Sequence, residues 1–207
     1  MKICITCVAA VLAVAGASAI ALSVPSARAV APAASAAAAT EAAMSYTVDT
    51  VHSSVIFKAK HNNVANFYGR FDHVSGTFAL ADGGSFDIAI KADSVHSGHP
   101  GRDDHLRNPD FFSAKEFPTM TFKSSSVKAQ GTDTFEVSGN LTFRGVTKPL
   151  TVMVKSTGTG EARGKKISGM ETRFSIKRSD FGSRFGVEGG ALSDEVELVV
   201  SLEGIAG

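Results

Sequence analysis

Three histidines and two carboxylates lie close together in the chain and have the residue types of a metal site. His96, His99 and His105 fall within ten residues, next to Asp103 and Asp104. Imidazole and carboxylate groups are ligands for zinc and copper. The spacing is loose, however, and the sequence lacks the His-Glu-x-x-His pattern of metalloproteases. The alternative is that His96 and His99 are exposed loop residues and that His105 caps or packs a short helix. On this basis we expect no bound metal.

Sequence patterns typical of catalytic centres are missing. No Gly-x-Ser-x-Gly elbow and no Walker-type or dinucleotide glycine pattern occurs. The segment Ser125–Lys128 matches Ser-x-x-Lys, but it lies at the end of an expected strand and lacks the companion motifs. We therefore expect neither an enzyme nor a bound cofactor.

Two pairs of opposite charge are candidates for acid–base chemistry. Arg102 is adjacent to Asp103, and Arg178 is two residues from Asp180. No second polar cluster accompanies either pair, so local ion pairs that hold loops in place are the preferred interpretation. Gly182 then permits a positive φ in the turn after Asp180.

The elements that position these residues are short β-strands. Apolar residues alternate with polar ones, which puts one face of each strand inward. Turn signals such as Asp82-Gly83-Gly84 and Gly158-Thr159-Gly160 separate the runs. Short strands joined by tight turns predict an all-β, antiparallel barrel of roughly eight strands, closed on itself to avoid exposed edges. The inward residues are Val55, Phe57, Ala59, Phe86, Ile88, Ile90, Met120, Phe122, Leu141, Phe143, Leu150, Val152, Val154, Val196, Leu198, Val200 and Leu202.

His61 continues the inward phase of Val55, Phe57 and Ala59. It is therefore expected to be either a core histidine with a hydrogen-bond partner or a polar contact for a molecule inside the barrel.

One stretch, residues 94–117, interrupts the strand pattern with glycines and prolines that a strand does not tolerate. Within it, Arg102–Arg107 has the propensity of one or two helical turns, and we expect one short helical insertion around residues 102–116. Phe111 and Phe112 follow in a connection where exposure is costly. They are expected to plug either the end of the barrel or a hole in it.

Many of the 14 phenylalanines fall in the inward phase or in this plugging segment. A barrel of about eight strands is either filled by side chains or just wide enough for one small ligand, and periodicity cannot choose between these two states. The residues concerned are Phe57, Phe71, Phe78, Phe86, Phe111, Phe112, Phe117, Phe122, Phe143, Phe174 and Phe181.

The N-terminus is expected to direct export. Residues 1–29 combine Lys2, a long apolar run and an Ala27-Arg28-Ala29 cleavage motif, as in a secretory signal peptide, with an uncleaved anchor as the alternative. Residues 30–44 form an Ala-rich flexible linker, and residues 45–207 form one folded domain.

Both cysteines, Cys4 and Cys7, precede the cleavage site. Cleavage removes Lys2 and Arg28 from the 21 basic residues, which leaves 19 basic residues against 20 acidic ones. This nearly neutral balance excludes a general affinity for nucleic acid.

The chain resembles the YceI-like family of exported polyisoprenoid-binding proteins over residues 46–204. The resemblance rests on a first-strand signature, a specific central block and a glycine-flanked hairpin. These segments are Ser54–His61, Gly69-Arg70-Phe71, Gly76-Thr77-Phe78, Arg102–Arg107, Asp110-Phe111-Phe112, Phe117-Pro118, Thr121–Ser124, Gly139–Lys148 and Arg178–Gly182.

This resemblance implies a lipocalin-like barrel with an elongated apolar tunnel that sequesters or carries a polyisoprenoid or quinone-like lipid without catalysis, in the periplasm or outside the cell. Scavenging of hydrophobic toxicants or antibiotics and, less favoured, an enzyme acting on the bound lipid are the alternatives. A homodimer and transient contact with a membrane are left open. The residues expected to contact the ligand are Phe57, His61, Phe71, Phe78, Ile88, Arg102, Asp103, His105, Leu106, Phe111, Phe112, Phe122, Leu141, Phe143 and Phe181.

Overall fold

The computed structural model describes residues 43–207; the expected signal peptide (1–29) and nearly all of the expected linker (30–44) lie outside the described residues. Across this described range, no helix has the length and apolarity that a bilayer crossing needs. The strands are β1 (Tyr46–Val48), β2 (Ser54–His61), β3 (Ala65–Phe71), β4 (Val74–Phe78), β5 (Phe86–Lys91), β6 (Val95–His96), β7 (Thr119–Ala129), β8 (Thr134–Phe143), β9 (Val146–Ala162), β10 (Lys165–Lys177) and β11 (Glu195–Ala206).

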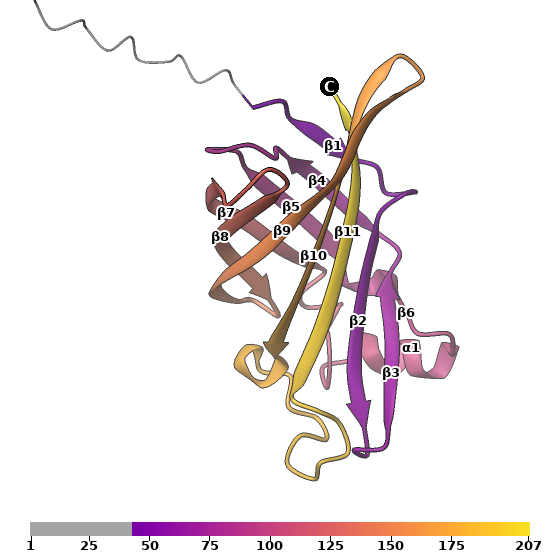
Figure 1. The fold of residues 1–207 in the computed structure, drawn as a ribbon. Coiled ribbons are helices and arrows are strands. Elements are labelled where there is room, and N and C mark those ends of the chain that lie inside the picture. Colours follow the sequence, from indigo (N-terminus) through magenta and orange to yellow (C-terminus); the bar gives the residue numbers. More distant parts are fainter. Residues whose placement is uncertain (1–42) are drawn as a thin grey trace, which may run out of the picture. The chain divides into compact units, whose positions relative to one another are not determined.

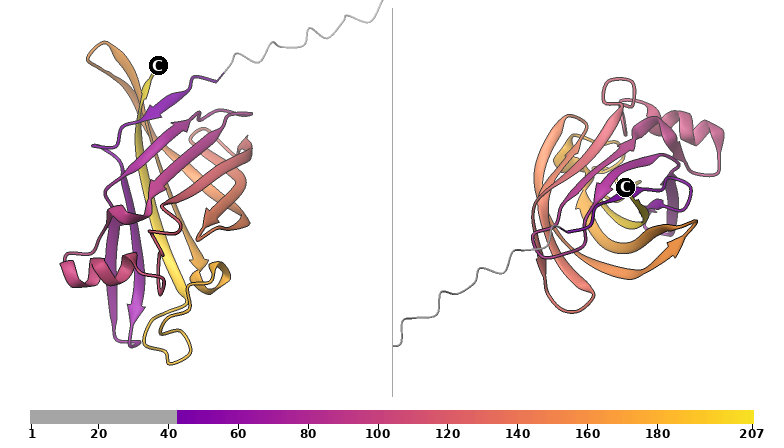
Figure 2. Two further views of the ribbon diagram at one scale, coloured as in Figure 1. Left: turned by 180° about the vertical axis from the view of Figure 1, so that it is seen from behind. Right: turned by 90° about the horizontal axis from the view of Figure 1, so that it is seen from above.

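Eight of these strands form a closed antiparallel barrel, as predicted. Their order is β1-β4-β5-β7-β8-β9-β10-β11, and β1 pairs again with β11. The closing register joins Tyr46 to Ala206 and Val48 to Gly204. Viewed from above, the strands surround a common centre and the helix lies outside them (Figure 2).

The remaining strands extend the wall beside β11. The C-terminal end of β11 pairs with β1, whereas its earlier residues pair with β2, from Ser201↔Ser54 to Glu197↔Lys58. β2 pairs with β3, and β3 pairs with the two-residue strand β6 (Figure 1). The expectation that no strand lies between residues 94 and 117 is therefore wrong at Val95 and His96, because these two residues reach the free edge of β3 before the glycines and prolines begin.

The short helix α1 spans Pro100–Arg107 rather than the expected residues 102–116. It begins earlier because proline is favoured in the first turn and because the His99 side chain accepts a hydrogen bond from the Arg102 amide. It ends at Arg107, since Pro109 cannot continue it. The residues after it form turns, with Ser113 at a φ of 48°.

Phe112 closes the wall where the sheet stops at β6. Its ring centre lies 5.1 Å from that of Phe71 and 5.8 Å from those of Phe57 and Phe143. These contacts connect β2 and β3 with the end of β8. Of the pair expected to plug either the end of the barrel or a hole in it, Phe112 therefore packs into the wall, whereas the Phe111 ring lies against His105 and Phe185.

Closure at β1 depends on the absence of a side chain at Gly204. A Cβ atom there would lie 2.7 Å from Cε1 of Phe78 and 2.7 Å from Cβ of Tyr46. We expect Gly204→Ala to lower the free energy of unfolding by about 1–3 kcal/mol, as overpacking does. Chemical denaturation measures this change. The control is Gly131→Ala in the turn between β7 and β8, where a Cβ would meet no atom within 4 Å; equal losses in the two variants would contradict the packing explanation.

Candidate ligand-binding cavity

The barrel encloses an apolar cavity. Its volume is about 160 Å³. Of its 28 lining residues, all but Thr121, Thr172, Arg178 and Ser183 are apolar. The apolar ones are Val55, Phe57, Phe71, Phe86, Ile88, Ile90, Leu106, Phe111, Phe112, Met120, Phe122, Val137, Leu141, Phe143, Leu150, Val152, Val154, Met170, Phe174, Ile176, Val196, Leu198, Val200 and Leu202.

The cavity is elongated along the strands. On β11, alternate residues from Val196 to Leu202 line it, and on β10 alternate residues from Met170 to Ile176 do so. At about 3.3 Å per residue, each row extends about 20 Å. The cavity is therefore a tunnel running along the barrel wall. The residues predicted to face inward line it, except Ala59, His61, Phe78 and Phe181.

The polar side chains in the lining are mostly bonded to the protein backbone. The Thr172 hydroxyl donates to the Met153 carbonyl at 2.7 Å, and the Ser183 hydroxyl donates to the Asp110 carbonyl at 3.2 Å. Bonds of this kind allow a hydroxyl to sit in an apolar wall without an unmet hydrogen bond. The interior therefore offers a ligand few directional contacts.

Arg178 is the charged residue in the lining, and it is buried. Its guanidinium donates to four carbonyl oxygens, those of Ser183, Phe185, Leu192 and Ser193, at 2.7–3.3 Å. Burial lowers the pKa of Arg178, and the Asp194 carboxylate acts in the opposite direction. The expected ion pair with Asp180 does not form, because the carbonyls of the loop 182–194 accept the hydrogen bonds of the guanidinium. The expected role of Arg178 in holding a loop in place is confirmed.

Nine of the 15 sequence-predicted contact residues line the cavity and six do not. The nine are Phe57, Phe71, Ile88, Leu106, Phe111, Phe112, Phe122, Leu141 and Phe143. The six are His61, Phe78, Arg102, Asp103, His105 and Phe181.

Three of the six were expected to face the inside of the barrel, but they do not line the cavity. His61 is exposed, because β2 runs beyond the barrel and its last residue meets only Ala65 of β3 and Leu192. Phe78 is buried but packs away from the cavity on Tyr46 and Phe86, with ring centres 5.7 and 6.0 Å away.

Phe181, the third of these, is also buried. It packs against the Phe143 ring at 5.5 Å and lines a second, separate cavity. Its position shows that an inward-pointing aromatic residue can support the lining without belonging to it.

The three polar residues of α1 attach the helix to the barrel exterior instead of facing a ligand. The Arg102 guanidinium donates to Ser97 and lies 4.6 Å from the Phe67 ring centre. The buried Asp103 carboxylate accepts from the amide of Ser97 at 2.7 Å and from its hydroxyl. Burial acts to raise the pKa of Asp103, but the bonds from Ser97 outweigh it and leave the pKa below 3.8. His105 contacts Asp110 at 2.9 Å.

Sequence reasoning missed most of the contribution of β10. Met170, Thr172, Phe174 and Ile176 line the cavity, and among them only Phe174 was considered. The signal was present, because these residues alternate with Glu171, Arg173, Ser175 and Lys177 in the period-two pattern that identified the other strands.

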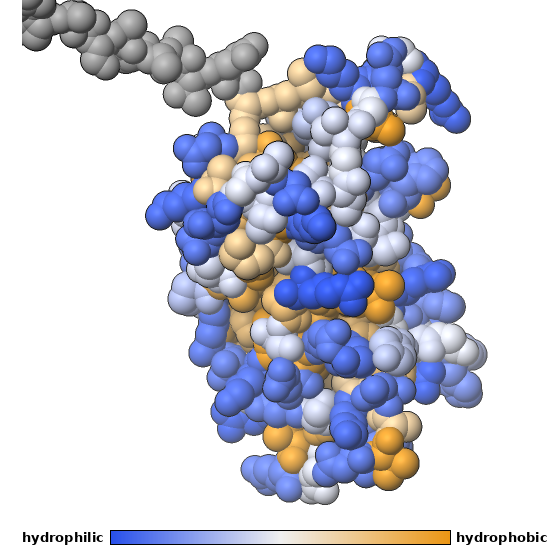
Figure 3. Space-filling view, in the orientation of Figure 1, coloured by the Kyte–Doolittle hydropathy of each residue, from blue (hydrophilic) through white to orange (hydrophobic). Residues whose placement is uncertain are grey.

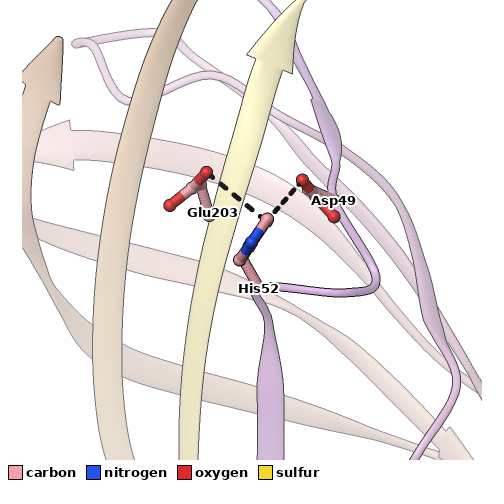
Figure 4. Close-up of side chains that lie close together, drawn as sticks. All are labelled: Asp49, His52 and Glu203. Atoms are coloured by element: carbon pink, nitrogen blue, oxygen red, sulfur yellow. Dashed lines mark hydrogen bonds and ion pairs between the residues drawn. The ribbon is translucent and has the colours of Figure 1, made fainter. Parts of the chain in front are cut away.

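A group with metal-binding residue types lies outside the cavity, and it is not the histidine cluster considered from the sequence. His52 Nδ1 lies 2.8 Å from Asp49 Oδ2 and 3.9 Å from Glu203 Oε1 (Figure 4). Asp49 and His52 lie in the turn after β1, Glu203 lies on β11, and 64% of the His52 side chain is exposed. Because the near nitrogen of His52 already pairs with Asp49, we interpret the group as an ion pair that ties this turn to β11.

The ion pair predicts a raised histidine pKa. The hydrogen bond to Asp49 and its charge raise the pKa of His52 above 6.5. NMR titration of the intact protein should show this shift, and Asp49→Asn should return the value toward 6.5. Since the folded-state pKa is the higher one, the contribution of the pair to stability is present below pH 6.5 and is lost as pH rises through that pKa. Glu203→Gln should lower the pKa of His52 less than Asp49→Asn does, because the Glu203 carboxylate is farther away. A His52 pKa that is not raised in the unchanged protein would contradict the ion pair.

Arg178 predicts a large structural effect. Arg178→Met leaves four loop carbonyls without their donor, and we expect the free energy of unfolding to fall by about 3 kcal/mol. Denaturant titration measures this loss. Arg184→Met in the same loop is the control, because Arg184 is exposed and surface substitutions change stability by about 0.5 kcal/mol or less. A loss no greater than that of the control would contradict the role assigned to Arg178.

A closed antiparallel barrel around an elongated apolar cavity defines a class of protein, the barrels able to hold one small ligand in their interior. Residues 46–204 match the YceI-like domain, and the chain belongs to this family. Among the relatives, a UPF0312 protein of Pseudomonas aeruginosa is 38% identical over 170 residues, covering 79% of this chain and 87% of the relative. Protein YceI of Salmonella newport is 37% identical with the same coverage.

Solved structures share the fold. BcnA of Burkholderia cenocepacia superimposes with a TM-score of 0.69 at 27% identity, over 75% of this chain and 98% of BcnA. A domain from Saccharophagus degradans described as polyisoprenoid-binding superimposes with a TM-score of 0.64, over 79% of this chain and 99% of the domain. Its identity is 20%, so the likeness to this domain shows a common fold.

Proposed function

We propose that this protein binds the hydrocarbon tail of a polyisoprenoid or quinone-like lipid inside its barrel, and that it sequesters or carries the lipid without changing it. The observation that carries the proposal is the tunnel itself, in which 24 of the 28 lining residues are apolar. The name of the Saccharophagus domain with the same fold supports the choice of ligand class.

The energetics of such a tunnel suit a lipid tail. Removing a CH₂ group from water is favourable by about 0.8 kcal/mol. Ordering a flexible chain opposes this gain, so affinity does not grow without limit as the chain lengthens. Because the lining offers few directional groups, binding should depend more on tail length and width than on chemical detail.

The side chains of the lining also support a role without catalysis. A centre acting on the bound lipid would need at least two titratable groups converging on it. The guanidinium of Arg178 is bonded to four carbonyls, and the hydroxyls of Thr172 and Ser183 are bonded to two others. These groups hold the wall together, and the proposed activity needs no cofactor.

The proposed location is the periplasm or the outside of the cell. It rests on the sequence of residues 1–29, which has the charged start, the apolar run and the small-residue cleavage motif of a secretory signal peptide. A lipid carrier is useful in such a compartment because long hydrocarbon chains are nearly insoluble in water.

The direct test is to identify what the purified protein contains. The mature chain is purified without detergent and extracted with organic solvent, and the extract is examined by mass spectrometry. An isoprenoid or quinone recovered in near-stoichiometric amount supports the proposal, and repeated absence of any amphiphile contradicts it. If antibiotics or similar compounds displace a fluorescent isoprenoid more strongly than lipids do, the scavenger alternative is favoured.

Blocking the tunnel should prevent binding. Val200 lies in the lining near the middle of β11, whereas its neighbour Val199 does not line the cavity. We expect Val200→Trp to weaken binding of a fluorescent isoprenoid by about tenfold or more, since overpacking of about 1–3 kcal/mol opposes the ligand. Val199→Trp is the matched control and should bind as the unchanged protein does. Equal affinities for the two variants would show that the lipid binds elsewhere.

A further inference from the structure

The wall of the barrel is split on one side. β9 and β10 pair only from Lys165↔Ala162 to Thr172↔Val154. Beyond that point, residues 146–153 of β9 pair only with β8, and residues 173–177 of β10 pair only with β11. The two strands therefore separate over their remaining length (Figure 1).

Two residues account for this separation. Where the pairing ends, the Met153 carbonyl accepts its hydrogen bond from the Thr172 hydroxyl, at 2.7 Å. Pro149 lies in the part of β9 that does not pair with β10. Because proline has no N–H to donate to a neighbouring strand, it is tolerated at the edge of a sheet but not inside a continuous one. The split is thus built into the sequence of β9 and β10.

A second cavity of about 190 Å³ occupies the split. Three of its lining residues, Leu141, Leu150 and Ile176, also line the main tunnel. These apolar side chains are the boundary that the two spaces share. In the space-filling view, apolar surface shows between polar side chains on the face where β9 and β10 separate (Figure 3).

The second cavity also has charged residues in its lining. Lys148, Lys177 and Asp180 line it, which gives two cations against one anion. Within residues 43–207, neither lysine has a carboxylate in ion-pair distance or a side-chain hydrogen bond. Lys148 is half-buried and comes from β9, whereas Lys177 is exposed and comes from the end of β10. The arrangement favours a small anion held between the two separated strands.

We propose that the split between β9 and β10 is a side entrance to the tunnel, where Lys148 and Lys177 hold the anionic head group of a single-chain lipid. The tail then passes between Leu141, Leu150 and Ile176 into the apolar interior. This proposal rests on the proposed function and adds the position and the charge of the head group. It also replaces His61 and the residues of α1, which the sequence suggested as the polar contacts for a ligand.

The head-group part is tested with two lipids that share one tail, geranylgeraniol and geranylgeranyl phosphate. Their affinities are measured for the mature protein, for the variant Lys148→Gln/Lys177→Gln, and for the control Lys165→Gln/Lys166→Gln at the other end of β10, where both lysines are exposed. We expect the first variant to bind the phosphate about tenfold more weakly and the alcohol unchanged. The control should bind both lipids as the unchanged protein does. A phosphate affinity that is equal in the two variants would overturn the head-group assignment.

The entrance part is tested by kinetics. Ser175 lines the second cavity and is exposed, and Ser175→Trp should obstruct the split without altering the tunnel. We expect association and dissociation of a fluorescent isoprenoid to slow together by about tenfold, which leaves the equilibrium affinity almost unchanged. Ser75→Trp on β4 is the matched control, because Ser75 is also an exposed serine on the outer wall. Unchanged rates in Ser175→Trp would rule out this route.

The outcomes separate the two proposals. If the unchanged protein binds neither lipid, the proposed function itself fails. If it binds both and the variants leave affinities and rates unchanged, the tunnel is a lipid site that is reached from elsewhere, and only the side entrance is rejected.

Discussion

The pairing of β11 on both of its edges is the constraint on which the rest of the structure depends. One edge carries β10, and the other carries β1 near the C-terminus and β2 before it. Pairing on both sides leaves β11 without a free edge, and its register fixes which residues face inward. The same register places alternate residues of β11 along the tunnel. The close approach at Gly204, where β11 meets Tyr46 and Phe78, shows how tightly the two ends of the sheet fit together.

Closure creates an interior that side chains do not fill completely. Phenylalanines and branched aliphatic residues cover the wall, and Phe112 closes the gap beyond β6. The polar groups that reach the interior are held by the backbone, with the Arg178 guanidinium distributed over four carbonyls of one loop. A space with this lining suits the hydrocarbon tail that we propose as its ligand.

Barrel closure is incomplete where β9 and β10 separate, and the opening there has both apolar and charged residues in its lining. Where β9 and β10 separate, Leu150 and Ile176 line both cavities, and Lys148 and Lys177 line the opening beside them. An amphiphile has the same division between a tail and a head. The split therefore brings the apolar interior next to two lysines that the sequence did not single out.

Alternation along the strands was sufficient to predict the closed antiparallel barrel and most of its lining, because the side-chain period of a strand depends only on local geometry. It went wrong at His61 and Phe78, where the strand runs past the barrel or the residue faces another part of the core. Arg102, Asp103 and His105 were misplaced for a related reason: a helix attached to the outside directs its polar side chains to Ser97 and Asp110 instead of the tunnel. The apolar cavity, the split in the wall and the lysines beside it were decided only by the tertiary structure, since each depends on which strands become neighbours and where their pairing ends.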